Sequence, residues 1–306
     1  MFCFENCEEN RTRSFLALGG FLEQKQPQRI KAPAEYNALL SCGRSGIIQL
    51  NKLDAAGAVM KKTLNANMIK VIAIIAMTID HIAWLLFPGY PNEAVPVVLH
   101  MIGRITCPIM CYFIAEGYHH TKDINKYTTR LFVFAFISHF AYVFASANYT
   151  DWKSFIPFYY GDILNQTSVM WSLAWGLVML RVAHSEKIKQ NAQPFLIILI
   201  CFISFLSDWS CIASLCVLAF GTNRGNFKKQ MLWMVFYAAM YSIVYFFAID
   251  KLYGLIQMAV VLSIPIIKMY NGQRGRSKSI NRIMKWMFYI YYPLHLLVIG
   301  WIQFVC

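Results

Sequence analysis

The sequence predicts an all-α integral membrane protein, a polytopic helical bundle with about nine transmembrane segments. Three observations support this class. The chain of 306 residues is 58% hydrophobic and only 14% charged, whereas soluble domains carry roughly 25% charged residues. Its mean hydropathy is +0.45. From Asn67 onward, apolar stretches of membrane-spanning length follow one another with short polar linkers between them.

The net charge of the chain is +13. Lysines and arginines that crowd the cytoplasmic ends of membrane helices explain this value more simply than a nucleic-acid partner does. We therefore expect membrane lipids, and no nucleic acid, at the surface.

The first sixty residues differ from the rest of the chain. Residues 1–60 mix charges, glycines and short apolar runs, and they contain neither a spanning helix nor a signal peptide. At Met60 the sequence becomes MKKTLNANMIKVIAIIAM, which is typical of the start of a bacterial membrane protein. We expect 1–60 to be a cytoplasmic extension or to precede the native start, and 61–306 to be the transmembrane domain.

Apolar length and punctuation by Pro, Gly and charge define the expected spans. They are 68–87, 94–118, 127–147, 166–183, 194–207, 209–221, 230–249, 252–270 and 284–305. The fifth and sixth are short, so 194–221 is either a hairpin around Asp208 or one tilted helix.

The distribution of basic residues favours the hairpin. With nine crossings, the linkers 119–126, 184–193, 222–229 and 271–283, which are rich in Lys and Arg, all share a side with Met60. Cytoplasmic loops carry such an excess of positive charge. The sequence therefore predicts the bacterial cytoplasmic membrane, with Met60 on the cytoplasmic side and the C-terminus outside.

Four ionisable side chains lie near the middle of predicted spans, namely His81, Arg104, His139 and His295. A charged group at the bilayer centre costs at least ~2.5 kcal/mol, so such groups usually pair with one another or serve a site. Because Arg stays protonated, Arg104 needs an anionic partner, and Asp80 is the candidate at the same level. We therefore expect a buried polar site.

A histidine near a carboxylate is suited to general-base catalysis, because the carboxylate fixes the tautomer and raises the basicity of the ring. Asp80 and His81 are adjacent, however, and their side chains diverge by about 100° on a helix. Hydrogen bonding across helices for packing is the alternative explanation of His81. In the last span, Pro293 is expected to bend the helix near Tyr292 and His295.

Other polar residues carry weaker signals. Glu116 and His120 are spaced i,i+4 on a helix, which supplies only two ligands, so no metal is predicted. Five of the nine cysteines lie in apolar segments without a CxxC pair and are expected to be small core residues. Most tryptophans, including Trp84 and Trp209, are expected to anchor the chain at the membrane interfaces.

Several blocks together resemble the TraX family of bacterial membrane proteins. They are IAMTIDHIAWLLF, HMIGRITCPIMCYFIAEGYHHTKDINKYTTRLFVFAFISHFAYVFA and YNGQRGRSKSINRIMKWMFYIYYPLHLLVIG, which cover most of residues 68–304. This resemblance implies an acetyltransferase that uses cytoplasmic acetyl-CoA. The implied acceptor is a pilin-like N-terminal amine or, by a more distant similarity, an extracytoplasmic glycan hydroxyl.

By position in these motifs, the resemblance assigns His81 as general base or transient acetyl carrier, with Asp80 and Arg104 beside it. The remaining motif residues become candidates for substrate or donor binding: Glu116, His119, His120, Tyr127, Arg130, Tyr292 and His295. The chain departs from the family pattern at two places. His139 stands in ISHF where an acidic residue is expected, and SDWSC keeps Asp208 but lacks the aromatic and glycine pair of a DYG-like turn.

The phosphates of acetyl-CoA require cations on the cytoplasmic face. One candidate group surrounds Arg274 and continues to Lys278, Arg282 and Lys285, and the other runs from His120 to Arg130. For either group taken alone, retention of loops in the cytoplasm and binding of lipid headgroups are the simpler explanation. Two other classes remain open for the whole protein: a transporter, since buried Arg, His and Asp also build proton pathways, and a non-catalytic assembly protein.

Overall fold

The computed structural model describes residues 62–146, 155–156 and 167–305. Within these residues all regular structure is helical, apart from two isolated bridges that join Leu64 to Tyr270 and Thr167 to Ser207. The prediction of an all-α bundle is confirmed. The predicted extension 1–60 lies outside the described residues.

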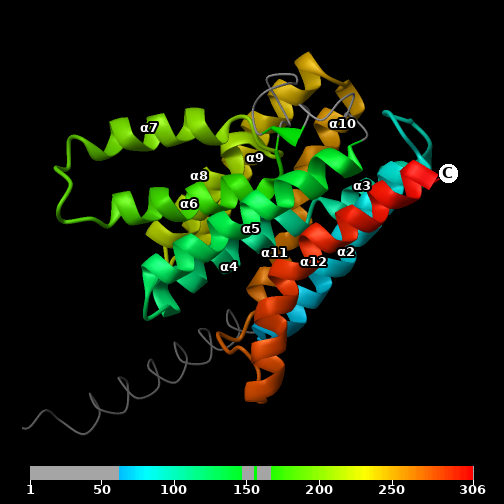
Figure 1. Ribbon diagram of the computed structural model, residues 1–306. Coiled ribbons are helices and arrows are strands. Elements are labelled where there is room, and N and C mark those ends of the chain that lie inside the picture. Colours follow the sequence, from blue (N-terminus) through cyan, green and yellow to red (C-terminus); the bar gives the residue numbers. More distant parts are fainter. Residues whose placement is uncertain (1–61, 147–154, 157–166, 306) are drawn as a thin grey trace, which may run out of the picture. The chain divides into compact units, whose positions relative to one another are not determined.

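Four long helices form the frame of the bundle (Figure 1). At a rise of ~1.5 Å per residue each spans the ~30 Å of a hydrocarbon layer. Side-chain caps begin three of them, where Asn65, Asp123 and Asn226 each accept a hydrogen bond from the backbone N–H three residues later. The four are α2 (Ala66–Leu86), α5 (Ile124–Ala145), α9 (Phe227–Ala248) and α12 (Lys278–Val305).

Two further spans are interrupted helices. The second predicted span consists of α3 (Ala94–Gly103) and α4 (Thr106–His120), with a break at Arg104 and Ile105. Pro108 accounts for the break, because it lacks an N–H and its ring clashes with the carbonyl four residues earlier, that of Arg104. The eighth is α10 (Lys251–Ile256), the 3₁₀ helix η2 (Gln257–Leu262) and α11 (Ser263–Lys268).

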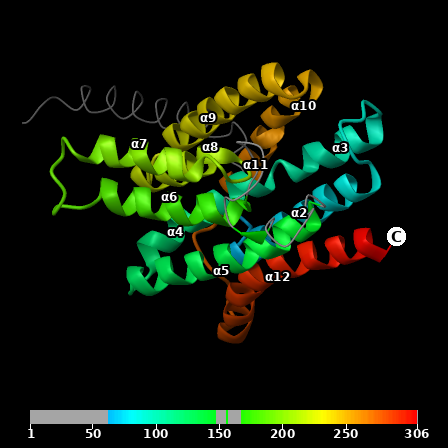
Figure 2. The same cartoon turned by 45° about the horizontal axis from the view of Figure 1, so that its top comes forward.

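The three remaining helices are shorter. They are α6 (Val169–Ala183), α7 (Gln193–Ser204) and α8 (Ser210–Thr222). The chain reverses between α7 and α8, so the two lie side by side (Figures 1 and 2), and the alternative of one tilted helix over 194–221 is wrong. Six helical runs of the described chain are long and apolar enough to span a membrane, and these three are shorter apolar helices. The number of crossings therefore stays a prediction.

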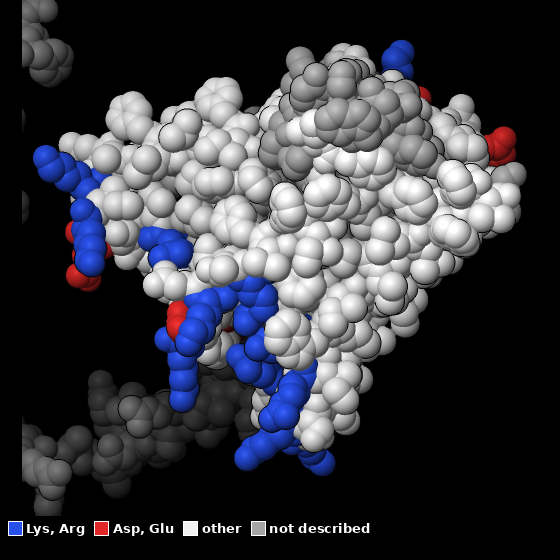
Figure 3. Space-filling view, in the orientation of Figure 1, with Lys and Arg blue, Asp and Glu red and all other residues white. Residues whose placement is uncertain are grey.

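The outer surface is strongly apolar. Phe247 is 82% exposed, Phe195 74% and Phe202 72%, which a soluble protein rarely tolerates on this scale. Lys and Arg gather instead along the left and lower edges in Figure 3, where the turn between α4 and α5 and the start of α12 lie in the same view. The protein is thus a multi-pass membrane protein with one strongly basic edge.

Helices α2 and α12 run side by side in the same direction. Three contacts fix their register: Asn67 donates to Asn281 at 2.6 Å, the hydroxyls of Thr78 and Tyr291 lie 2.6 Å apart, and the rings of His81 and His295 meet. The last helix begins at Lys278 rather than at the predicted 284, so its first turns extend into the basic edge. The parallel pair connects that edge to the polar interior.

Candidate functional site

A cavity of about 480 Å³ lies among α2, α4, α5, α9 and α12 and the turn between α7 and α8. It extends past the end of α2, where Pro88, Gly89 and Tyr90 line it, and reaches Gln303 near the end of α12. Five residues predicted for the site line this cavity, together with a row of tyrosines. They are Asp80, His81, Arg104, Asp208 and Tyr292, with Tyr142, Tyr241 and Tyr245.

Asp80 is the centre of a buried ionic cluster. Arg104 Nη2 donates to both carboxylate oxygens of Asp80, at 2.8 and 3.1 Å, and His100 Nδ1 lies 2.8 Å from Asp80 Oδ1. Arg104 Nη1 also donates to Gln257 Oε1 at 3.2 Å. The predicted pairing of Asp80 with Arg104 is confirmed, and the charge of the guanidinium is neutralised within the bundle.

Gly103 makes this cluster possible. A Cβ at this position would lie 2.3 Å from Asp80 Cβ and Cγ, where no side chain fits. The missing side chain lets α3 approach α2 closely enough for the carboxylate to reach both His100 and Arg104.

His81 faces a different neighbour from Asp80, as its position one residue further along the helix requires. Its Nδ1 lies 2.8 Å from the carbonyl oxygen of Met77. A carbonyl only accepts, so Nδ1 carries the proton and Nε2 of the neutral ring keeps its lone pair. The two adjacent side chains diverge as expected, because Asp80 is turned toward His100 and Arg104.

The second partner of His81 is His295. His295 Nδ1 lies 2.9 Å from the carbonyl oxygen of Tyr291, so it is also protonated, and its Nε2 accepts from His81 Nδ1 at 3.4 Å. The ring of Tyr291 stacks on His295 with centroids 5.2 Å apart and an interplanar angle of 9°. His295 and Tyr291 thus reinforce one tautomer of His81.

Asp208 enters the cavity from the turn between α7 and α8. Its N–H donates to the carbonyl of Thr167 at 2.8 Å, and His139 Nδ1 lies 3.1 Å from the Thr167 hydroxyl. Two successive residues, Trp209 (φ +62°) and Ser210 (φ +50°), then adopt left-handed backbone conformations. Such conformations are costly outside glycine and are concentrated at functional sites.

His139 does not line the cavity but contacts Thr167, the residue that accepts from the Asp208 N–H. Besides Thr167 it contacts the carbonyl oxygen of Phe155 at 3.2 Å through Nε2, and it is buried. Its position next to Thr167 lets it support the segment that holds Asp208. The two departures from the family pattern, at His139 and at the SDWSC turn, are therefore neighbours in space.

Three other predicted residues lie at the opposite end of α4. Glu116 binds His120 and Arg224, each at 3.2 Å, and His119 Nε2 lies 3.1 Å from the carbonyl oxygen of Gly221. These contacts attach α4 to the turn between α8 and α9. Glu116, His119 and His120 do not line the cavity.

Tyr127, Arg130 and Arg274 form a third location, near the starts of α2 and α12. The Tyr127 hydroxyl donates to the carbonyl of Ile114 at 3.4 Å. The Arg130 guanidinium carbon lies 5.4 Å from the centroid of the Tyr127 ring. Arg274 is close enough to Tyr127 to act on it electrostatically. The predicted residues therefore fall into separate groups rather than one site.

The sequence alone did not single out His100, Gln257 or the tyrosines of the cavity. His100 precedes Arg104 by four residues, so both side chains lie on the face of the helix that meets α2, and this spacing was the available signal. Two tryptophans expected at the membrane interfaces line the cavity. Trp209 lies 5.4 Å from the Arg104 guanidinium carbon and stacks on Tyr241, and Trp84 packs on His100 with centroids 4.5 Å apart.

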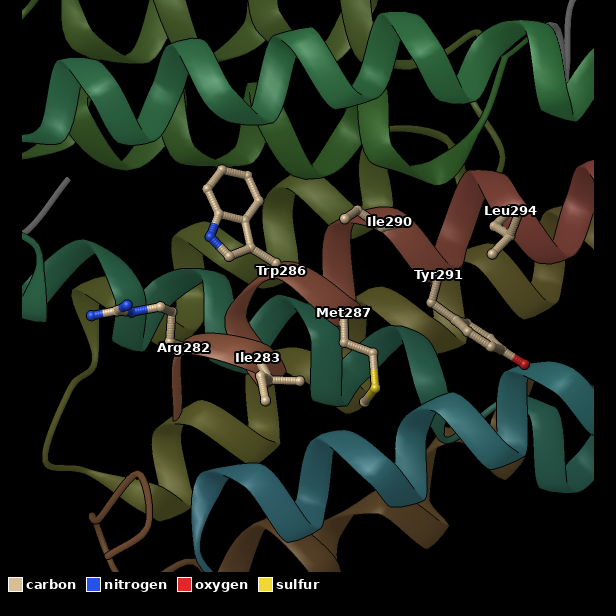
Figure 4. A pocket seen from close by; sticks show the side chains of 7 residues that line it. All are labelled: Arg282, Ile283, Trp286, Met287, Ile290, Tyr291 and Leu294. Atoms are coloured by element: carbon tan, nitrogen blue, oxygen red, sulfur yellow. The ribbon is translucent and has the colours of Figure 1, made fainter. Parts of the chain in front are cut away.

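A second cavity, of about 430 Å³, is a shallow apolar groove along α12 (Figure 4). Arg282 lies at one end, and Tyr291 at the other points toward α2. Of the residues that the sequence suggested for the donor, this groove contains Arg282 alone. No group of three or more potential metal ligands occurs among the described residues, and the five cysteines of the apolar segments are free thiols there.

The helices and the cavity define a polytopic α-helical membrane protein with a cluster of ionisable side chains inside the bundle. The chain belongs to the TraX family, because the family described as TraX protein matches residues 65–303. It is 28% identical over 244 residues to a probable fimbrial assembly protein FimC, serogroup H1, of Dichelobacter nodosus, a match that covers 76% of this chain and 93% of that protein.

A second relative matches a shorter part of the chain. An uncharacterised protein of Rickettsia prowazekii (strain Madrid E) is 33% identical over 76 residues, which cover 25% of this chain and 26% of that protein. No solved structure matches the chain.

Proposed function

We propose that the protein is an acetyl-CoA-dependent acyltransferase that delivers an acetyl group to an acceptor on the far side of the bacterial cytoplasmic membrane. The observation that carries this proposal is the tautomer of His81. Its Nδ1 proton is bound to the Met77 carbonyl, so Nε2 is the basic nitrogen of a ring that lines the cavity. A positioned imidazole with a free lone pair is the group that general-base catalysis needs.

In the proposed reaction His81 Nε2 takes a proton from the acceptor as the acceptor attacks the carbonyl carbon of the thioester. The new bond to nitrogen or oxygen forms and the C–S bond breaks. The departing thiolate then takes the proton from the His81 imidazolium, which releases coenzyme A as a thiol and restores the neutral ring. A transient acetyl-imidazole would use the same nitrogen.

Arg104 has a separate proposed role. It lines the cavity with its positive charge held in place by Asp80, and its Nε is buried without a hydrogen-bond partner in the described chain. A fixed cation in a water-poor site stabilises the oxyanion that develops when a thioester is attacked. Trp209 and Tyr241 cover this part of the cavity and would keep water from hydrolysing the donor.

The orientation follows from the charge asymmetry. The basic edge of Figure 3 matches the excess of Lys and Arg expected in cytoplasm. We therefore place the Met60 side and the starts of α2 and α12 in the cytoplasm, where the donor is available. The C-terminus and the mouth of the cavity near Tyr90 and Gln303 then face outward, toward the acceptor.

A pilin-like peptide amine is the favoured acceptor. The relative from Dichelobacter nodosus is described as a probable fimbrial assembly protein, and family membership connects the chain to pilin acetylation. A glycan hydroxyl is the second acceptor class that the same chemistry serves, because His81 would deprotonate either group.

The direct test uses the full chain purified in lipid nanodiscs with acetyl-labelled acetyl-CoA. Three acceptors are compared: a peptide with a free N-terminus, the same peptide with a blocked N-terminus, and an oligosaccharide. We expect label on the free peptide only. Label on the oligosaccharide would replace the amine by a hydroxyl acceptor, and the absence of both transfer and thioester loss with every acceptor would refute the enzymatic proposal.

A further inference from the structure

Four cations from four different parts of the chain meet at the basic edge. They are Lys70 of α2, Arg130 of α5, Arg274 of the loop before α12 and Lys285 of α12. Lys70 is close enough to Arg274 for the two charges to repel one another, and Lys285 is repelled by both Arg130 and Arg274. This grouping, called the cation cluster below, joins members of both basic groups that the sequence suggested and adds Lys70.

The cluster lacks the counter-ions that such a gathering requires. No described carboxylate lies within salt-bridge distance of any of the four side chains. Glu116, which acts on nearby Tyr270, is already engaged with His120 and Arg224. Like charges that repel one another cost free energy, which a bound anion would recover.

Two of the cations lie deeper in the protein than retention of a loop in the cytoplasm requires. Lys70 is half-buried inside α2, with Nζ 5.5 Å from the ring centroid of Phe113 and 5.4 Å from that of Phe288. Arg130 lies between the rings of Tyr127 and Tyr289, and its Nε is buried without a hydrogen-bond acceptor in the described chain. Residues that only retain a loop in the cytoplasm need no such aromatic surroundings.

Hydrogen bonds to the starts of α2 and α12 hold the loop that carries Arg274. The N–H groups of Ala66 and Asn67 donate to the carbonyls of Gln273 and Arg274, at 2.8 and 3.3 Å. Asn281 accepts from Asn67 and donates to the carbonyl of Gly275. Gly275 has φ +142°, and a Cβ there would lie 2.7 Å from Asn67 Nδ2. These contacts place Arg274 beside the first turns of α2 and α12, whose N-terminal ends add partial positive charge.

We propose that the cation cluster binds the phosphate groups of the acyl donor, an inference that rests on the function proposed above. The position is suitable, because Lys70 and His81 lie on the same face of α2, eleven residues and about 16 Å apart along the axis. A nucleotide held at the cluster would leave its flexible thiol-bearing arm free to follow the seam between α2 and α12 toward His81. The chemical class recognised is a nucleotide that carries several phosphates.

The experiment measures ligand binding by the full chain in nanodiscs of neutral phosphatidylcholine. The probes are coenzyme A, adenosine 3′,5′-bisphosphate and pantetheine, which lacks phosphate. Arg274→Gln and Lys285→Gln are the test variants because both residues are exposed, so the fold is retained. Arg276→Gln is the matched control, since it removes the same charge from the same loop outside the cluster.

We expect each test variant to weaken binding of coenzyme A and of the bisphosphate by about tenfold, as loss of one charge-assisted contact does. Binding of pantetheine, and binding by Arg276→Gln, should not change. An equal loss of nucleotide binding in the test and control variants would overturn the assignment, because it would indicate unspecific attraction between charges. Coenzyme A binding unchanged by the variants, together with binding of anionic phosphatidylglycerol that the variants abolish, would overturn it in favour of a lipid site.

The binding experiment tests the cluster assignment separately from the acyltransferase proposal. His81→Ala should bind the bisphosphate as the unaltered protein does. If no acetyl transfer is found but the variants of the cluster still lose nucleotide binding, the cluster is a nucleotide site and the acyltransferase proposal fails. If transfer occurs and Arg274→Gln and Lys285→Gln bind coenzyme A normally, the acyltransferase proposal stands and the cluster assignment fails.

Discussion

The Nδ1 atom of His81 and the Nε2 atom of His295 lie 3.4 Å apart on parallel helices. Backbone carbonyls of Met77 and Tyr291 hold the Nδ1 protons of the two rings. The pair is therefore directional: His295 accepts through Nε2, and Nε2 of His81, whose ring lines the cavity, keeps its lone pair. Helices α2 and α12 create this relationship, because their register is fixed both here and at Asn67 and Asn281.

The first prediction concerns His295. His295→Leu removes one of the two acceptors that hold His81 in a single tautomer. We therefore expect kcat for acetyl transfer to fall by about tenfold, less than the roughly 10²-fold to 10⁴-fold that loss of a general base itself costs. His295→Gln supplies a side-chain oxygen that can accept from His81 and should recover part of the rate. The pH profile of kcat should shift in the Leu variant. Identical rates and profiles in all three proteins would show that His295 only packs.

The second prediction concerns the ion pair of Asp80 and Arg104. Removal of one partner leaves a buried charge uncompensated, so Asp80→Asn and Arg104→Gln should each lower the free energy of unfolding by ~3–5 kcal/mol. The double variant should lose clearly less than the sum, because it leaves no unpaired charge. Unfolding free energies of the four proteins in one detergent complete this cycle. Strict additivity would mean that the two side chains do not interact.

The third prediction concerns Gly103. Gly103→Ala places a methyl group where the Asp80 side chain lies, so α3 must move away from α2 or the carboxylate must turn. We expect loss of stability by ~1–3 kcal/mol, as overpacking typically causes, and a loss of activity. Ile102→Ala on the preceding, half-buried position removes volume instead and is the comparison. Unchanged thermal stability of Gly103→Ala would contradict the close approach of the two helices.

The fourth prediction concerns the strained backbone that directly follows Asp208. Ser210 has φ +50°, which costs a residue with a side chain roughly 1–2 kcal/mol and costs glycine little. Ser210→Gly should therefore raise the unfolding free energy by ~1 kcal/mol. Ser214→Gly, within the same helix but at ordinary helical φ, should lower it instead and also loses a hydrogen bond to the carbonyl of Ser172. Destabilisation by both changes would remove the argument for strain at Ser210.

The helices were predictable because hydropathy and charge act over long stretches. All nine predicted segments correspond to helices or helical runs, and the hairpin around Asp208 followed from the positions of Lys and Arg alone. Interruptions were harder to predict. Pro265 stands two residues after the start of α11, as Pro108 does in α4, but no proline marks the change from α10 to η2.

The site was predictable only where a charged residue in an apolar helix required a partner of opposite charge. Arg104 in an apolar helix required a carboxylate, and Asp80 supplied it. The partner of His81 depended on the register of α12 against α2, which no local pattern contains. His100 was overlooked because its partner Asp80 lies on another helix. Glu116 and Tyr127 lie away from the cavity because of helix packing, which the order of the motifs does not encode.

The most direct test of the account is the rate of acetyl transfer from labelled acetyl-CoA by His81→Ala, compared with the unaltered protein and with His184→Ala. His184 is a histidine at the end of α6 whose Nδ1 contacts the carbonyl of Leu180, outside the cavity. Retained binding of adenosine 3′,5′-bisphosphate shows that each variant is folded. We expect His81→Ala to lose about 10²-fold to 10⁴-fold in kcat while His184→Ala keeps its rate. A His81→Ala protein that transfers acetyl groups as fast as His184→Ala would contradict the central role of His81.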